Sequence, residues 1–135
     1  MSTIECPLLS SEIKWFKILI VEDRSSYRRI LKDNLAMQFP FIIIEEAATG
    51  KEALEKVETF LPDLIFMDIH LPGKNGLQLT SEIKRNHPDI TIIVITSDDS
   101  QKVRQAAFEA GASCFSAKDS LDLEVISPFM KYRLE

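Results

Sequence analysis

The sequence predicts an open α/β fold, in which helices cover both faces of a parallel β-sheet to give three layers. Three apolar runs without polar alternation carry this prediction: residues 18–21 (ILIV), 64–67 (LIFM) and 92–95 (IIVI). Such runs are typical of strands that are buried on both faces of a parallel sheet. Helix-like segments separate the runs, and regular alternation of strands and helices indicates right-handed crossovers within one sheet.

The elements follow from apolar runs, from period-3.6 stripes and from short turns rich in glycine, proline, asparagine and serine. We predict strands over residues 16–22, 41–46, 63–68, 90–95 and 113–117. Helices are predicted over 25–38, 50–60, 76–86 and 100–110, with a fifth, irregular helix after 119. The apolar stripe of the first helix consists of Tyr27, Ile30, Leu31 and Leu35. The fifth strand is the most polar, which is typical of an edge strand.

Size and charge restrict the class of protein. A chain of 135 residues fits one domain, which we place at 16–135 after a loose leader over 1–15. The net charge of -5 disfavours nucleic acid as a ligand, and the Arg28–Arg29 pair is interpreted as a solvated helix edge. No run is long enough to span a membrane, and no signal peptide is visible. Cys6 and Cys114 have no metal-ligand spacing, so we expect reduced thiols and a cytoplasmic location.

Oxygen-bearing side chains follow the three apolar runs directly: Glu22 and Asp23, then Asp68, then Thr96. Ligands bind outside the carboxyl ends of parallel strands, so these side chains are expected to share one pocket. Three neighbouring carboxylates repel one another, and Mg²⁺ would relieve that repulsion. Lys118 after the fifth strand would add a cation beside a phosphoryl group. A carboxylate nucleophile, a metal ion, a hydroxyl and a lysine are the components of phosphoryl transfer.

Four motifs in this order resemble the receiver domain of two-component response regulators: ILIVED, LIFMDIHLPGKNG, VITS and GASCFSAKDS. The resemblance covers residues 16–126 and includes EAATGKEAL at 46–54. It implies a flavodoxin-like (βα)5 fold with the strand order 2-1-3-4-5. The resemblance further implies a phosphorelay protein, a phosphoprotein that carries an aspartyl phosphate and acts in signal transduction.

The resemblance also assigns roles to individual residues. Asp68 would be the phosphoacceptor, which receives its phosphoryl group from a histidine kinase or a phosphotransfer protein. Glu22, Asp23 and Asp68 would bind Mg²⁺ together with the backbone carbonyl of His70. Lys118 would contact the phosphoryl oxygens.

Thr96 and Phe115 would form the conformational switch. The Thr96 hydroxyl would turn toward the phosphoryl group, and Phe115 would swing inward with it. The new charge at Asp68 favours this closed state. The surface formed by the fourth helix, fifth strand and fifth helix would then change for a downstream effector protein. A phosphorylation-dependent homodimer is a further expectation.

Several alternative interpretations remain open. Asp119 stands where many receivers have proline, and Lys118–Asp119 resembles the branch that carries helix-turn-helix output domains. The chain is therefore interpreted as a single-domain regulator or as the N-terminal fragment of a DNA-binding one. Pro128 falls where the fifth helix should run, so we expect that helix to be short, kinked, or restarted with Ser127 as its cap and Pro128 at its first position. An aspartate-nucleophile phosphatase would need an acid at position 70, where this chain has His70, and a degenerate receiver would lack competent site residues. We therefore predict a signalling protein and not an enzyme.

Overall fold

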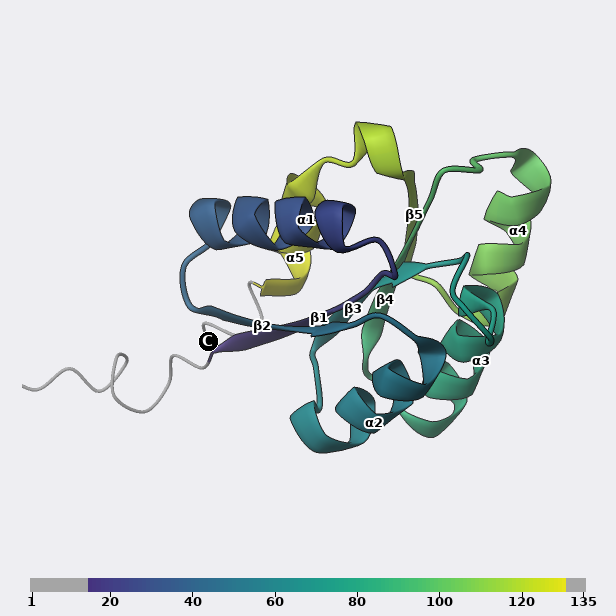
Figure 1. The fold of residues 1–135 in the computed structure, drawn as a ribbon, viewed down its shortest axis with the longest axis horizontal. Coiled ribbons are helices and arrows are strands. Elements are labelled where there is room, and N and C mark those ends of the chain that lie inside the picture. Colours follow the sequence, from purple (N-terminus) through teal and green to yellow (C-terminus); the bar gives the residue numbers. More distant parts are fainter. Residues whose placement is uncertain (1–14, 131–135) are drawn as a thin grey trace, which may run out of the picture.

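The computed structural model describes residues 15–130 of the chain, and Figure 1 shows their arrangement. Five strands alternate with helices along the chain. The strands are β1 (Phe16–Val21), β2 (Ile42–Ala47), β3 (Leu64–Asp68), β4 (Thr91–Thr96) and β5 (Cys114–Ala117). The helices are α1 (Ser25–Gln38), α2 (Gly50–Phe60), α3 (Gly76–Asn86), α4 (Gln101–Ala110) and α5 (Ser127–Met130). The predicted positions of the five strands and of the first four helices agree with these bounds to within one residue at each end.

All five strands belong to one parallel sheet with the order β2-β1-β3-β4-β5. This is the order that the flavodoxin-like fold implied, so the predicted fold class is confirmed. β5 lies at an edge of the sheet, as its polar sequence indicated. The register places Val21 beside Met67 and Asp68 beside Ile95, so β1, β3 and β4 end side by side.

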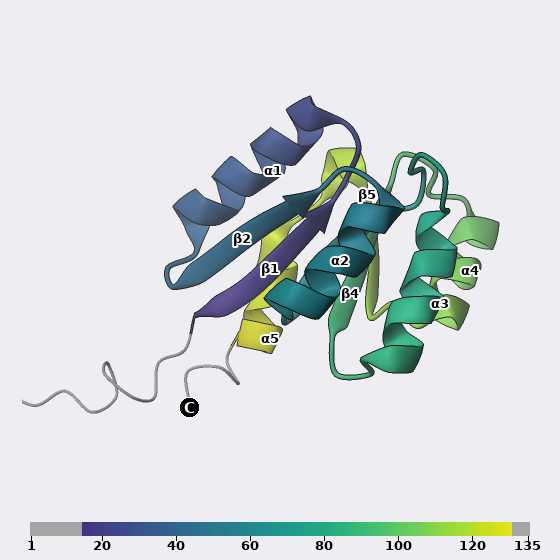
Figure 2. The same ribbon diagram turned by 60° about the horizontal axis from the view of Figure 1, so that its bottom comes forward.

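Each face of the sheet is covered by its own helices (Figure 2). The buried side chains form two separate hydrophobic cores, one on each face. α2, α3 and α4 pack on one face through Ala53, Val57, Leu79, Ile83 and Ala107. α1 packs on the opposite face with Leu31 and Leu35, and Ile126 of the C-terminal segment joins this core. The central strands β1, β3 and β4 contribute fully buried side chains to both cores, which explains why their sequences show no polar alternation.

α2, α3 and α4 begin after residues whose side chains cap them, whereas Arg24 before α1 makes no side-chain cap hydrogen bond. Thr49 accepts a hydrogen bond from the Glu52 amide, and the Glu52 carboxylate accepts one from the amide of Ala48, the residue before the cap, so two backbone donors at the start of α2 are satisfied. Asn75 caps α3 through the amide of Leu77 at 2.6 Å. α4 ends at Gly111, whose φ of 111° is accessible to glycine. These local signals account for the accuracy of the predicted bounds.

The structure differs from the sequence analysis in two details of α1. Ile30 was assigned to the buried stripe, but its side chain is 59% exposed. The buried residues of α1 are Leu31 and Leu35. The apolar stripe that packs on the sheet is therefore narrower than predicted. Arg28 was interpreted as a solvated helix edge, yet its side chain is only 19% exposed and it contacts the main chain beside the predicted site.

After β5 the chain forms two 3₁₀ turns, Lys118–Ser120 and Leu123–Ile126, followed by the single turn of α5. Pro128 is the second residue of α5, where a missing backbone N–H costs no intrahelical hydrogen bond. The predicted leader over 1–15 lies outside the described residues except for Trp15, and so do residues 131–135. Within residues 15–130, no helix combines the length and the apolar character needed to cross a membrane.

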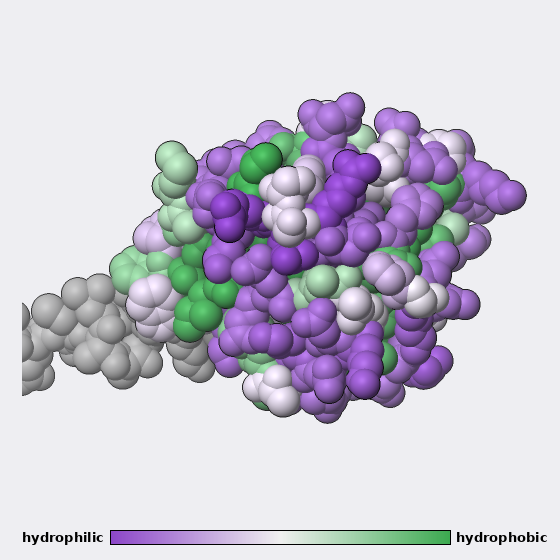
Figure 3. All heavy atoms as spheres, in the orientation of Figure 1, coloured by the Kyte–Doolittle hydropathy of each residue, from purple (hydrophilic) through white to green (hydrophobic). Residues whose placement is uncertain are grey.

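Most of the face seen in Figure 3 is hydrophilic. Hydrophobic residues gather at its left end, where the N-terminal ends of β1 and β2 lie in Figure 1. Large exposed apolar side chains in this part of the fold are Trp15, Phe41 and Ile43, and the rings of Trp15 and Phe41 meet edge to face at 5.7 Å. This end is opposite the predicted site.

Candidate functional site

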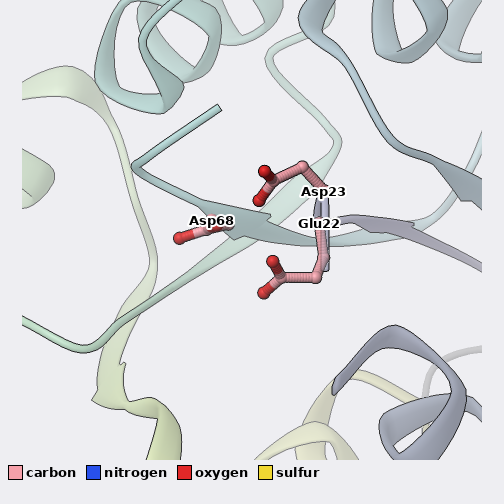
Figure 4. A group of neighbouring side chains, drawn as sticks. All are labelled: Glu22, Asp23 and Asp68. Atoms are coloured by element: carbon pink, nitrogen blue, oxygen red, sulfur yellow. The ribbon is translucent and has the colours of Figure 1, made fainter. Parts of the chain in front are cut away.

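Three acidic side chains meet at the carboxyl end of the sheet (Figure 4). Glu22 and Asp23 follow β1 directly, and Asp68 is the last residue of the neighbouring strand β3. Their carboxylates point into one space, and each offers an oxygen within 4.8 Å of the others. The structure therefore brings together the acidic residues that the sequence analysis grouped.

Burial disfavours the ionised form of the carboxylates in this cluster. Glu22 is fully buried and Asp68 is 2% exposed, whereas Asp23 is exposed to solvent. Burial is the largest influence on Glu22 and raises its pKa above the ordinary value, and the Asp68 charge adds to this, although Lys118 and the Arg24 amide oppose the shift. A nearby cation would stabilise the ionised form of these carboxylates.

Lys118 supplies a cation from the protein itself. It follows β5 directly, and its ammonium lies 2.5 Å from Glu22 Oε1 and 3.4 Å from Asp68 Oδ2. Its side chain is only 16% exposed, so solvent screens these contacts weakly. Asp68 also accepts a hydrogen bond on Oδ1 from the backbone amide of His70 at 3.3 Å. The His70 side chain itself is exposed.

The turn after Asp68 is shaped by a glycine that tolerates no substitution in this geometry. The amide of Gly76 donates to the Ile69 carbonyl at 2.8 Å, which draws the start of α3 against the end of β3. A Cβ at position 76 would lie 2.1 Å from the Asp68 carbonyl oxygen and 2.7 Å from Ile69 Cα. Gly76 thus lets two backbones approach closely beside the candidate phosphoacceptor.

The two predicted switch residues lie on the adjoining strands. Thr96 ends β4 and is fully buried, and its hydroxyl oxygen accepts a hydrogen bond from the Asp98 amide at 3.0 Å. Since that bond uses an oxygen lone pair, the hydroxyl proton stays available as a donor. Phe115 in β5 is half-buried and packs against the core shared with α4. The Arg104 guanidinium lies over its ring, 4.9 Å from the centroid.

Two residues of α1 reach this site although the sequence analysis gave them other roles. Tyr27, assigned to the core stripe, donates a hydrogen bond to the Lys118 carbonyl at 3.0 Å. Arg28 donates to the Glu22 carbonyl at 2.7 Å and to Glu46 at 2.9 Å. Tyr27 and Arg28 lie four and five residues after Asp23, in the first turn of α1. The predicted topology alone could have indicated that this turn lies near the site.

The donor set of the acidic cluster fits a hard divalent cation. Glu22, Asp23 and Asp68 offer carboxylate oxygens, and the exposure of Asp23 leaves room for water ligands on one side. Mg²⁺ prefers one or two carboxylates together with several water molecules, often beside phosphate. Among residues 15–130, these three residues form the one group of three or more potential metal ligands.

Comparisons with known proteins agree with this geometry. The family model of the response regulator receiver domain matches residues 18–127. The uncharacterized transcriptional regulatory protein YhcZ of Bacillus subtilis is 36% identical over 110 residues, 82% of this chain and 51% of the relative. The response regulator protein VraR of Staphylococcus aureus is 33% identical over 111 residues, 78% of this chain and 53% of the relative. The chain spans about half the length of these curated relatives.

Solved structures show the same fold. A two-component response regulator of the LuxR family from Aurantimonas aligns with a TM-score of 0.77 at 26% identity, covering 89% of this chain and 86% of its own. A CheY-like receiver domain protein from Methanospirillum hungatei aligns with a TM-score of 0.76 at 26% identity, covering 90% and 94%. The family match covers most of the chain, and the fold agrees with it. This chain belongs to the family of response regulator receiver domains of two-component systems.

Proposed function

We propose that this receiver domain accepts a phosphoryl group on Asp68 in a Mg²⁺-dependent reaction and acts as a signalling switch. The observation that carries the proposal is the position of Lys118, whose ammonium lies within 3.4 Å of Asp68 and 2.5 Å of Glu22. A carboxylate nucleophile beside a fixed cation and a cluster of metal ligands is the arrangement that phosphoryl transfer requires.

In the proposed reaction, an Asp68 carboxylate oxygen attacks the phosphorus of a phosphohistidine. The new P–O bond forms as the P–N bond breaks, and the imidazole leaves with its electron pair. Negative charge spreads over the phosphoryl oxygens, and the Lys118 ammonium is close enough to Asp68 Oδ2 to stabilise it. The His70 amide, which donates to Asp68 Oδ1, orients the attacking carboxylate.

Glu22, Asp23 and Asp68 are the proposed Mg²⁺ ligands, with the His70 carbonyl as a fourth protein ligand. When bound there, Mg²⁺ would neutralise the carboxylates and the incoming phosphoryl group. The cluster supports this proposal because its buried members are held close together with one lysine as counter-charge. The chain is a signalling domain, and the chemistry proposed for it is limited to its own phosphorylation and dephosphorylation.

Phosphorylation is proposed to act on Thr96 and Phe115. The Thr96 proton would turn to the phosphoryl oxygens, and Phe115 would move inward from its position under Arg104. The surface formed by α4, β5 and α5 would change with it. A downstream effector protein is the expected reader of this change, and a phosphorylation-dependent homodimer is a second outcome of the same rearrangement. A cytoplasmic location is proposed for the chain.

A second candidate is that this domain regulates DNA binding by an output domain in the same protein. YhcZ and VraR are named as a transcriptional regulatory protein and a response regulator, and this chain matches about half of each. In that case, the proposed switch surface would contact the output domain instead of a separate effector. The phosphoryl donor would be a histidine kinase or a phosphotransfer protein in both cases.

Intact-mass spectrometry after incubation with acetyl phosphate and Mg²⁺ tests the central proposal. We expect the wild type to gain the mass of one phosphoryl group, and chelation of Mg²⁺ to abolish the gain. Asp68→Asn should not be labelled. Asp89→Asn is the matched control, because Asp89 is an exposed aspartate just before β4, at the other end of the strand.

Three results would contradict the proposal. An unlabelled wild type would remove the phosphoacceptor function, and full labelling of Asp68→Asn would remove this role from Asp68. Labelling that proceeds unchanged in the presence of a chelator would remove the metal dependence. Turnover of a generic phosphate ester would instead favour an aspartate-nucleophile phosphatase.

A further inference from the structure

Tyr27 holds Lys118 at two points. Its hydroxyl donates a hydrogen bond to the main-chain carbonyl of Lys118 at 3.0 Å. Its ring lies beside the end of the same side chain, with the Lys118 ammonium 5.0 Å from the ring centroid. These contacts join α1 to the turn after β5 across 91 positions of sequence. The Tyr27 side chain thus contacts both the backbone and the ammonium group of Lys118.

The lysine that Tyr27 contacts is the one that reaches the acidic cluster. Its ammonium lies between the ring of Tyr27 and the carboxylates of Glu22 and Asp68. A cavity of about 110 Å³ is lined by Tyr27, Lys118 and Leu31, among others. The Lys118 side chain therefore has open space on its α1 side, next to the Tyr27 ring.

The tyrosine is suited to act as a neutral donor. Burial raises its pKa to about 12, and the charges of Glu22, Asp68 and Asp119 contribute to the shift. The phenol therefore keeps its proton at neutral pH. A neutral phenol donates to a carbonyl, and the face of its ring attracts a cation.

We propose that Tyr27 is a positioning residue for the transfer of a phosphoryl group to Asp68. Its hydroxyl anchors the main chain of Lys118, and its ring directs the ammonium toward the acceptor carboxylate. In this role Tyr27 acts through Lys118, with which it makes both of these contacts. The inference rests on the proposed function, because it assigns Lys118 to that reaction.

A double-mutant cycle separates action through Lys118 from a general structural effect. Initial rates of phosphorylation by acetyl phosphate with saturating Mg²⁺ are measured for Tyr27→Phe and Tyr27→Leu, each with Lys118 intact and with Lys118→Ala. With Lys118 intact, loss of the hydroxyl should slow the reaction about threefold to tenfold, the range of one hydrogen bond. Tyr27→Leu also loses the ring and should be slower still. In the Lys118→Ala background, neither substitution should change the rate further.

Nuclear magnetic resonance of labelled lysine gives a second readout that does not depend on the reaction. The ring current of Tyr27 should displace the Cε and Hε resonances of Lys118 in the wild type. Tyr27→Phe should largely keep this displacement and Tyr27→Leu should abolish it. Any change in Mg²⁺ affinity among the three proteins should follow the position of Lys118, because Lys118 is paired with the proposed ligand Glu22 and Tyr27 is not a proposed ligand.

Three results would overturn the inference about Tyr27. Equal slowing by Tyr27→Leu in both backgrounds would show a structural role that bypasses Lys118. An unchanged Lys118 resonance in Tyr27→Leu would show that the ring does not position the lysine. This result is conclusive even if the Lys118→Ala proteins react too slowly for their rates to be compared. A wild type that is not phosphorylated at Asp68 would instead overturn the proposed function. Phosphorylation at Asp68 with equal rates in all Tyr27 variants would overturn only the inference about Tyr27.

Discussion

The Lys118 ammonium lies closer to Glu22, at 2.5 Å, than to Asp68, at 3.4 Å. The lysine thus forms its shorter ion pair with Glu22, a proposed metal ligand, and its longer one with Asp68, the proposed phosphoacceptor. A cation bound by Glu22 would compete with this pair. Occupation of the metal site would therefore free Lys118 to contact a phosphoryl group on Asp68.

Lys118→Met should make the metal-free protein less stable and its affinity for Mg²⁺ higher. Removing one partner of a buried ion pair leaves the carboxylates without a counter-charge, so the free energy of unfolding should fall by about 3 kcal/mol. Mg²⁺ should recover most of this loss and bind more tightly than to the wild type. Denaturant unfolding with and without Mg²⁺ measures both effects. Lys102→Met, at an exposed position of α4, is the control and should change neither quantity.

Gly76→Ala should disturb the site more than Gly73→Ala, although both glycines lie in the same turn region. A Cβ at position 76 would lie 2.1 Å from the Asp68 carbonyl oxygen, so the backbone of the acceptor must move, at a cost of about 3 kcal/mol. At position 73 a Cβ meets nothing within 4 Å, and only the φ of 81° is unfavourable, at about 1 kcal/mol. Unfolding experiments together with the rate of phosphorylation would distinguish the two. Equal rates in both variants would contradict this account of Gly76.

The fold was predictable because its signals are local and agree with one another. Uninterrupted apolar runs identified β1, β3 and β4, which are buried on both faces. Turn residues between the apolar segments indicated where helices begin, and in the structure Thr49 and Asn75 cap α2 and α3. The order of the strands is different, because it depends on packing between distant elements. It came from the resemblance to receiver domains and not from periodicity.

The site was predictable where its residues follow strands directly. Glu22, Asp23, Asp68 and Lys118 lie together because the ends of parallel strands meet at one edge of the sheet. Tyr27 and Arg28 were not recognised, because their contacts depend on how α1 is rotated over the sheet. An apolar stripe cannot distinguish a tyrosine that fills the core from one whose hydroxyl reaches a distant carbonyl. Ile30 was misassigned for the same reason.

Glu46 should contribute stability that disappears in acid. Burial opposes its ionisation, but hydrogen bonds from Lys32 at 3.1 Å and Arg28 at 2.9 Å outweigh this and hold its pKa below the ordinary value of 4.5. A carboxylate whose pKa is lower in the folded than in the unfolded state stabilises the fold above pH 4.5, and this contribution is lost as the pH falls through the folded value.

Glu46→Gln should therefore lower the free energy of unfolding near neutral pH by about 1 kcal/mol or less, because the pair is partly exposed. The difference from the wild type should shrink as the pH falls below 4.5. Denaturant unfolding across this pH range measures it. Glu55→Gln is the matched control, since Glu55 is exposed and forms no ion pair among residues 15–130. A Glu46→Gln difference that stays constant with pH would contradict the assignment.

Arg104→Ala should shift Phe115 toward the inward position before any phosphorylation. The guanidinium lies 4.9 Å from the ring centroid and so favours the position in which Phe115 is only half-buried. A cation–π contact at an exposed site contributes about 0.5–1 kcal/mol, which corresponds to a change of about twofold to fivefold in the ratio of inward to outward rings. Fluorine resonance of a fluorinated Phe115 would report the two populations, with Gln105→Ala as the control. If Arg104→Ala leaves the spectrum of the unphosphorylated protein unchanged, this contact does not restrain the proposed switch.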